Sequence, residues 1–118
     1  MLKKRIVKVA AATAAVAAFG LFNASSASAA SSTCESWDGI CYSGMVAANS
    51  NHEVCFSGTH KALSYWGRAE LWDSDTSVMV GSFATNPTET KTKCVGGLYG
   101  DHYYERGTGN YFLGKVWN

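Results

Sequence analysis

Helical periodicity and long apolar runs are both missing from the sequence after residue 29. No segment there repeats its apolar residues every 3.6 positions, so we expect little helix. No apolar stretch there is long enough to cross a bilayer as a helix, so an integral membrane span is not predicted. Repeats, linkers and low-complexity tracts are also absent, and 30–118 is therefore predicted to form a single domain.

Motifs that would name a reaction are missing too. The sequence has no Gly-x-Ser-x-Gly elbow, no HExxH, no P-loop and no paired-carboxylate pattern. The four cysteines are an even number, and a Cys–His nucleophile would need an unpaired thiol. We therefore expect the protein not to be an enzyme and to need no cofactor.

The first 29 residues have the pattern of a secretory signal peptide. An alanine-rich apolar stretch covers 9–22, and small residues follow it. The basic start consists of Lys3, Lys4, Arg5 and Lys8, and the cleavage motif is Ala27, Ser28 and Ala29. We predict that 1–29 is a cleaved Sec signal and that 30–118 is a secreted, extracellular β-domain.

Removing this segment changes the charge of the protein. The whole chain carries +1, but four of its ten basic residues lie in 1–29, so the mature domain is near −3 (a rough formal count). Nucleic-acid affinity comes largely from clustered lysines and arginines that release counterions. The scattered cations of this acidic domain argue against nucleic acid as a partner.

All four cysteines lie in the mature domain. A small exported domain has a thin core, and disulfides commonly stabilise it. Two disulfides can pair four cysteines in three ways. We favour Cys34 with Cys41 and Cys55 with Cys94, because the first pair closes a short N-terminal loop.

Short runs separated by turn residues fill the mature domain, which is the pattern of an all-β protein. We predict an antiparallel sandwich or small barrel of six to eight strands. Three hairpin turns are expected, at 73–76, at Gly96-Gly97 and at 106–110. The strands are predicted at 40–46, 52–57, 62–73, 77–84, 89–95, 98–104 and 110–117, and 30–33 is expected to be a frayed leader.

Aromatic residues crowd the C-terminal part of the chain. Because successive residues of a strand point to opposite faces, both faces cannot be core in so small a domain. One set could form an exposed contact face, and the alternative is that the rings are cross-strand pairs stabilising a thin sandwich. The predicted contact residues are Tyr103, Tyr104, Arg106, Tyr111 and Trp117.

His102 lies in the one cluster that could support acid–base chemistry, with Asp101 before it and Glu105 and Arg106 after it. The segment Gly100–Tyr103 resembles the last strand of secreted microbial guanyl-specific ribonucleases. The resemblance implies a general acid at His102, with an upstream Glu and Arg pair for which Glu53 or Glu70 and Arg68 are the candidates. A solvated strand end is the alternative.

Metal binding has weaker support. His52, Cys55 and His60 could approach zinc-ligand geometry only if the cysteines were reduced. Asp73–Ser77 matches the first positions of a calcium loop, but Val78 stands where that loop needs glycine. We predict no metal site.

Two further resemblances bear on function. The segment Cys34-x6-Cys41-Tyr42-Ser43-Gly44 resembles the start of small secreted actinobacterial peptidase inhibitors, which implies a crystallin-like fold. The layout of a Sec signal, a short β-domain and an aromatic last strand resembles lactococcin-type bacteriocins, which implies binding of a cell-wall precursor. An inhibitor would present a rigid loop, at 57–61 or 84–90.

We therefore expect a non-enzymatic secreted protein that binds a protein or cell-envelope target outside the cell. Bacteriocin-like antibacterial action is favoured slightly over enzyme inhibition, and a ribonuclease-like hydrolase using His102 is the third alternative. The target and the oligomeric state are left open by the sequence.

Overall fold

A computed structural model of the protein describes residues 30–61 and 66–118. The predicted signal peptide therefore lies outside the described residues. Within them, no helix is long and apolar enough to cross a membrane. The described strands are β3 (Ser31–Ser36), β4 (Ile40–Tyr42), β5 (Val54–His60), β6 (Gly67–Asp73), β7 (Val78–Thr85), β8 (Lys91–Val95), β9 (Tyr103–Thr108) and β10 (Phe112–Trp117).

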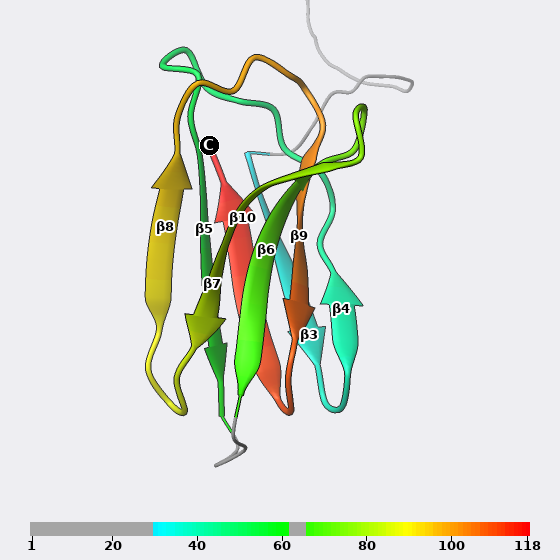
Figure 1. Cartoon of the computed structure of the whole chain (residues 1–118), viewed down its shortest axis with the longest axis vertical. Coiled ribbons are helices and arrows are strands. Elements are labelled where there is room, and N and C mark those ends of the chain that lie inside the picture. Colours follow the sequence, from blue (N-terminus) through cyan, green and yellow to red (C-terminus); the bar gives the residue numbers. More distant parts are fainter. Residues whose placement is uncertain (1–29, 62–65) are drawn as a thin grey trace, which may run out of the picture.

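The strands form two four-stranded antiparallel sheets that pack face to face (Figure 1). The first sheet has the order β3-β10-β5-β8 and the second has the order β4-β9-β6-β7. Counted along the chain from β3, this pairing of orders is that of an eight-stranded jelly roll. The predicted antiparallel sandwich is confirmed, whereas the crystallin-like fold implied by the inhibitor resemblance is wrong.

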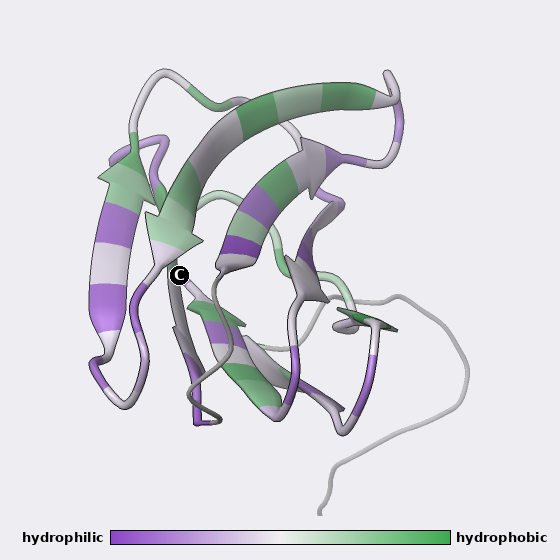
Figure 2. Cartoon of the chain, turned by 60° about the horizontal axis from the view of Figure 1, so that its bottom comes forward, coloured by the Kyte–Doolittle hydropathy of each residue, from purple (hydrophilic) through white to green (hydrophobic). Residues whose placement is uncertain are grey.

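Alternation along the strands separates an inner from an outer face in each sheet. In β6 the buried Ala69 and Leu71 alternate with Arg68, Glu70 and Trp72 on the outer face. Figure 2 shows the resulting stripes of hydrophilic and hydrophobic residues along the strands. Period-two patterning is what a sheet with one face on the core requires.

Phe112 occupies the centre of the core, and glycines make room for its ring. A Cβ built on Gly107 would overlap the Phe112 ring, and one on Gly114 would come within 2.7 Å of it. Gly58 is nearly as close, at 3.1 Å. At 107 and 114 a side chain would overlap the ring, so only glycine fits there, whereas at 58 a side chain would require the neighbouring atoms to shift slightly.

The two open edges of the sandwich are closed differently. At one edge the Cys34–Cys41 disulfide joins β3 of the first sheet to β4 of the second. At the other edge Lys91 of β8 donates a hydrogen bond of 3.0 Å to the carbonyl of Ala84 in β7. The ammonium of Lys91 also lies 5.7 Å from the ring centre of Phe83. A lysine placed here also discourages edge-to-edge pairing with another chain.

Several predicted strand boundaries are wrong. The expected N-terminal leader is strand β3, which pairs with β10. The predicted strand 98–104 is mostly loop, and β9 instead runs through the expected turn at 106–108.

Only the predicted hairpin at 73–76 joins neighbouring strands, β6 and β7. The turns after β8 and after β9 carry the chain to the opposite sheet, because Greek-key connections cross between sheets. The predictions of hairpins at Gly96-Gly97 and at 106–110 are therefore wrong.

Candidate functional site

Aromatic and charged side chains gather on the outer face of the second sheet. We call this surface the aromatic–arginine face. Its members come from β4, β9 and β6, and cross-strand pairing places them next to one another. They are Tyr42, Arg68, Glu70, Trp72, Tyr104 and Arg106.

Glu70 is the centre of this face. Its carboxylate accepts hydrogen bonds from Arg68 Nε at 3.0 Å, from Arg106 Nη1 at 2.9 Å and from Trp72 Nε1 at 3.0 Å. Arg68 also donates to Ser82 Oγ at 2.9 Å, in β7. The Glu70 side chain is 10% exposed, whereas those of Arg68 and Arg106 are 44% and 31% exposed. One nearly buried carboxylate thus holds three large side chains in place.

The electrostatics follow from this geometry. Burial alone would raise the pKa of Glu70, but the hydrogen bonds from Trp72, Arg106 and Arg68 outweigh it, so the pKa is lowered. The hydrogen bond to Glu70, and then one to the Tyr42 hydroxyl, raise the pKa of Arg106. The cluster is therefore fully charged at neutral pH.

Register aligns the face into two neighbouring rows across the strands. In the first row Tyr104 stands opposite Trp72, which stands opposite Met79 of β7. In the second row Arg106 stands between Tyr42 and Glu70. The Tyr42 and Tyr104 rings connect the two rows, with centroids 6.2 Å apart.

The five predicted contact residues do not share one face. Tyr104 and Arg106 lie on the aromatic–arginine face, but Tyr103 is 2% exposed and points into the core, so its prediction as a contact residue is wrong. Tyr111 lies in the turn before β10, 5.1 Å from the Trp37 ring. Trp117 lies on the outer face of the first sheet, beneath Lys115.

Four residues of the face were not among the predicted contact residues, namely Tyr42, Arg68, Glu70 and Trp72. The signal that could have found them is alternation. Arg68, Glu70 and Trp72 are alternate residues of one strand, and Tyr104 and Arg106 are alternate residues of another, so each set points to a single face of its strand. The partnership of these two strands could not be read from the chain, because thirty residues and two other strands separate them.

His102 does not join this cluster. It lies in the loop before β9, where its Nδ1 is 3.0 Å from Asp75 Oδ2. The hydrogen bond to Asp75 and the charge of that residue raise the pKa of His102, and the charges of Asp101 and Asp73 add to the effect. Arg106 follows four residues later, about 13 Å along an extended strand. His102 is thus beyond hydrogen-bond reach of Glu70 and Arg68, which form one candidate pair under the ribonuclease resemblance. Glu53, the alternative glutamate, lies beside Cys55 and Cys94 on the first sheet.

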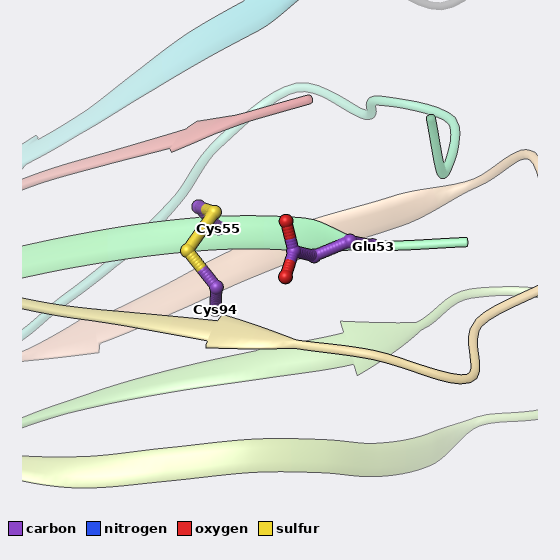
Figure 3. Close-up of side chains that lie close together, drawn as sticks. All are labelled: Glu53, Cys55 and Cys94. Atoms are coloured by element: carbon purple, nitrogen blue, oxygen red, sulfur yellow. A yellow bond between two sulfur atoms is a disulfide. The ribbon is translucent and has the colours of Figure 1, made fainter. Parts of the chain in front are cut away.

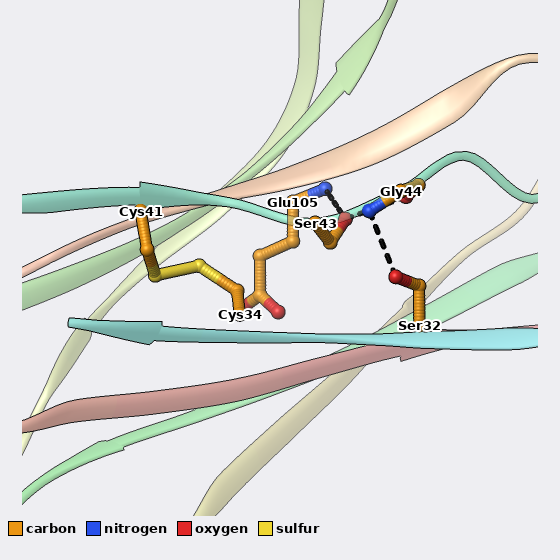
Figure 4. The surroundings of a disulfide bond; sticks show 6 residues. All are labelled: Ser32, Cys34, Cys41, Ser43, Gly44 and Glu105. Atoms are coloured by element: carbon orange, nitrogen blue, oxygen red, sulfur yellow. Dashed lines mark hydrogen bonds between the residues drawn. A yellow bond between two sulfur atoms is a disulfide. The ribbon is translucent and has the colours of Figure 1, made fainter.

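Glu105 points to the opposite side of the second sheet and is completely buried. Figure 4 places its carboxyl group between the two sheets, beside the Cys34–Cys41 disulfide. Neither carboxyl oxygen has a hydrogen-bond partner among the described residues. Burial raises the pKa of Glu105 to about 9, so the group is neutral at physiological pH.

The second disulfide, Cys55–Cys94, lies on the outer face of the first sheet, and the carboxylate of Glu53 is close to it (Figure 3). Both predicted disulfides are therefore present. Bonded sulfurs are not thiolates and offer a metal poor ligands. The disulfide therefore removes Cys55 from the alternative of a zinc site formed by His52, Cys55 and His60. In the structure the His52 ring lies against Tyr99, and His60 Nδ1 is hydrogen-bonded to Thr85 Oγ1.

Two hollows bordered by described residues lie along the first sheet. One, of about 150 Å³, is bordered by Trp37, Tyr111 and Lys61. The other is a wider groove of about 360 Å³ between β3, β10 and β5, and its lining includes three threonines, one serine, Glu35, Leu113 and Lys115. Neither hollow gathers charged groups in the way that the aromatic–arginine face does.

Comparison with known proteins does not assign this chain to a family. No protein-family model and no curated protein matches the chain. A similar solved chain comes from Bacillus endospore appendages, described as a novel family of disulfide-linked pili. It is 10% identical, with a TM-score of 0.32, and the match covers 80% of this chain and 95% of that one. A likeness of this size carries no argument about what this chain binds or assembles into.

Proposed function

We propose that the protein is a secreted, non-enzymatic binding protein whose contact surface is the aromatic–arginine face. The target lies outside the cell, and antibacterial action at the envelope of other bacteria is favoured. Two disulfides are typical of proteins that fold in an oxidising, extracytoplasmic compartment, which supports secretion. The separation of His102 from Glu70 and Arg68 supports action without catalysis.

The arrangement around Glu70 carries the proposal. Arginine and tryptophan side chains on a surface normally have many rotamers, and ordering them on binding costs free energy. Here Arg68, Arg106 and Trp72 are already fixed by a single carboxylate. Tyrosine, tryptophan and arginine are also the residues that most often dominate binding energy. A pre-ordered set of these residues on an exposed sheet face suits recognition of a partner.

Growth inhibition tests the proposal. The secreted, oxidised protein is added to related and unrelated bacteria, and growth, septation and sedimentation of labelled protein with the cells are measured. We expect inhibition of a narrow set of strains. Tyr42→Ala and Arg106→Gln should abolish both cell binding and inhibition, because they remove an exposed ring and a fixed cation from the face.

Tyr99→Ala is the matched control. Tyr99 is 76% exposed, but it lies in the loop between β8 and β9, against His52 and away from the face. This variant should retain full activity. Full activity of folded Tyr42→Ala and Arg106→Gln would show that the face is structural only.

Enzyme inhibition is a second candidate, supported by the loop at 86–90. The loop is exposed, and Thr88 has φ of 60°, a conformation that β-branched residues rarely adopt. The amide of Thr88 donates to the carbonyl of His60 at 2.8 Å, and β8, which follows, is bonded to β5 through Cys94. The other predicted inhibitory segment, 57–61, lies almost entirely in β5 and is largely buried, so that prediction is wrong.

Peptidase, glycosidase and lysozyme inhibition assays separate the two candidates. An inhibitory loop predicts that replacing 86–90 with glycine and serine abolishes inhibition, whereas Tyr42→Ala leaves it unchanged. The reverse pattern would support the aromatic–arginine face and exclude the loop.

A further inference from the structure

The aromatic–arginine face has more positive than negative charge. Two guanidinium groups, of Arg68 and Arg106, share the single carboxylate of Glu70. Glu70 is the one acidic side chain that the described strands place on this face, because Asp73 and Glu105 alternate to its opposite side. One positive charge is therefore left in excess, in a mature domain whose overall charge is negative.

The guanidinium groups also have unused donors. Each guanidinium has five N–H bonds in a planar fork that matches a carboxylate. Arg106 uses one on Glu70 and one on the Tyr42 hydroxyl, and Arg68 uses one on Glu70 and one on Ser82. Because both side chains are partly exposed, the remaining donors are available to an anion that approaches from solvent. Glu70 itself demonstrates that a carboxylate fits between them.

An apolar strip runs beside these donors. Tyr104, Trp72 and Met79 stand opposite one another on three adjacent strands, and Tyr42 on β4 extends the strip to the fourth. Four strands at the usual spacing make a strip about 14 Å long. Tyr42 is 62% exposed and Met79 is 40% exposed. Flat rings in such a line can stack against the apolar faces of successive sugar rings.

We propose that this face binds a linear polysaccharide whose sugars carry carboxylate groups. The sugar rings lie across the strands on Tyr42, Tyr104 and Trp72, and a carboxylate pairs with the outward donors of Arg68 and Arg106. The inference rests on the proposed binding function and specifies the ligand class of the same face. The acidic residues around His102, namely Asp73, Asp75 and Asp101, lie at the strand ends, on the side of the Tyr104 and Trp72 row that faces away from the arginines. They would repel the carboxylates of the polysaccharide on that side, so we expect these carboxylates on the arginine side of the strip.

Three hexameric probes test the inference by NMR titration of the isotope-labelled secreted protein. Hexagalacturonate has sugar rings and carboxylates, maltohexaose has rings without charge, and hexaglutamate has charge without rings. We expect hexagalacturonate to shift the amides of the aromatic–arginine face and to bind far more tightly than the other two. Arg106→Gln should weaken this binding about ten- to hundredfold, the range for a lost charge-assisted hydrogen bond.

Glu70→Gln is expected to tighten binding, a result that a misfolded variant would not give. This substitution removes the negative charge that competes for both arginines, and the amide oxygen of glutamine still accepts a hydrogen bond from the side chains that Glu70 orders. Binding of hexagalacturonate should therefore tighten severalfold. Lys115→Gln, which removes a cation from the opposite sheet, is the control for net charge and should have little effect.

The outcomes that overturn the inference are distinct from failure of the proposed function. Equal binding of maltohexaose would exclude the carboxylate and leave the binding face in place. Equal binding of hexaglutamate would exclude the sugar. If hexagalacturonate does not bind, the ligand class is wrong, and the effect of Tyr42→Ala on cell binding still decides whether the face has a target.

Discussion

Two glutamates lie back to back in the second sheet, and their environments are opposite. Glu70 stands opposite Arg106 and Glu105 stands opposite Leu71, so the two residues are neighbours across the β6–β9 pair. Glu70 points outward to three donors, and its pKa is lowered. Glu105 points inward and has no partner among the described residues, and its pKa is raised to about 9. The same side chain is an anion on one face and a neutral acid on the other.

This difference shows that the outer face of the sheet is adapted for contact, whereas the inner face contains a carboxyl group that destabilises the core. Alternation assigns position 105 to the core, where an apolar side chain would be expected. A carboxyl group there has lost its hydration without gaining a hydrogen bond, which destabilises the fold. Glu70 has exchanged water for charged donors and organises its neighbours. The predictions below change residues on the inner and outer sides of the sheets and compare the effects on stability or reactivity.

The largest effect should come from pH acting on Glu105. Its pKa is about 9 in the folded state and near 4.5 when unfolded, so between these values the folded protein binds the extra proton. Stability should therefore fall as pH rises, on the order of 1 kcal/mol for each pH unit. Urea unfolding at several pH values from 5 to 8, followed by tryptophan fluorescence, measures the slope.

Glu105→Gln should remove most of this slope, because the amide does not titrate. His102 contributes in the same direction, since its raised pKa gives stability below pH 6.5 that is lost as pH rises through the folded value. His102→Gln is therefore the control and should reduce the slope only slightly, because that residue is exposed. A steep slope that persists in Glu105→Gln would contradict the assignment to Glu105.

A smaller effect of opposite sign should come from Glu70. Glu70→Gln is expected to lower the free energy of unfolding at neutral pH by about 1–2 kcal/mol, because charge-assisted hydrogen bonds are lost. Since the pKa of Glu70 is lowered on folding, its contribution is present above about pH 4.5 and is lost as pH falls through the folded value. The variant should therefore lose less stability on acidification than the wild type. Glu89→Gln, at an exposed position, is the matched control.

The two disulfides also differ in burial, so we expect them to differ in their rates of reduction. Cys34 and Cys41 are both buried, whereas Cys94 is exposed. Because exchange requires access of an attacking thiolate, dithiothreitol should reduce Cys55–Cys94 faster, by about an order of magnitude or more. Alkylation followed by peptide mass mapping at short times measures the order. Simultaneous reduction would indicate that global unfolding limits both reactions.

The sequence predicted the fold class because that signal is local. Short runs, turn residues and four cysteines in a small domain indicate a disulfide-stabilised β-sandwich. The favoured disulfide pairing is also present. Strand β3 was missed because Ser31–Ser36 has no apolar alternation of its own, and it is held by pairing with β10 far along the chain.

Only two of the six residues of the candidate site were predicted, and the reason is topology. Tyr104 and Arg106 were identified, but Tyr103 was placed beside them because the strand was expected to end near 104 and the face was not known. Packing of β9 against β3 and β10 decides which of its alternate side chains are buried, and the local sequence does not show this packing. The same ignorance of partners concealed Glu70, whose role depends on a strand thirty-odd residues away.

The smallest effect on stability is expected for Tyr42→Ala, on the outer side of the comparison. Tyr42 is 62% exposed, and it has one tilted ring contact with Tyr104 and one exposed hydrogen bond from Arg106. Its removal should therefore change the free energy of unfolding by about 0.5–1 kcal/mol. Chemical unfolding of this variant and of Tyr99→Ala gives the comparison. A ring that contributes so little to stability has no structural need to be kept beside the arginines. If Tyr42→Ala instead destabilised the fold as a core substitution does, by about 3 kcal/mol or more, the ring would be part of the packing, and the case for a contact face would lose its most exposed member.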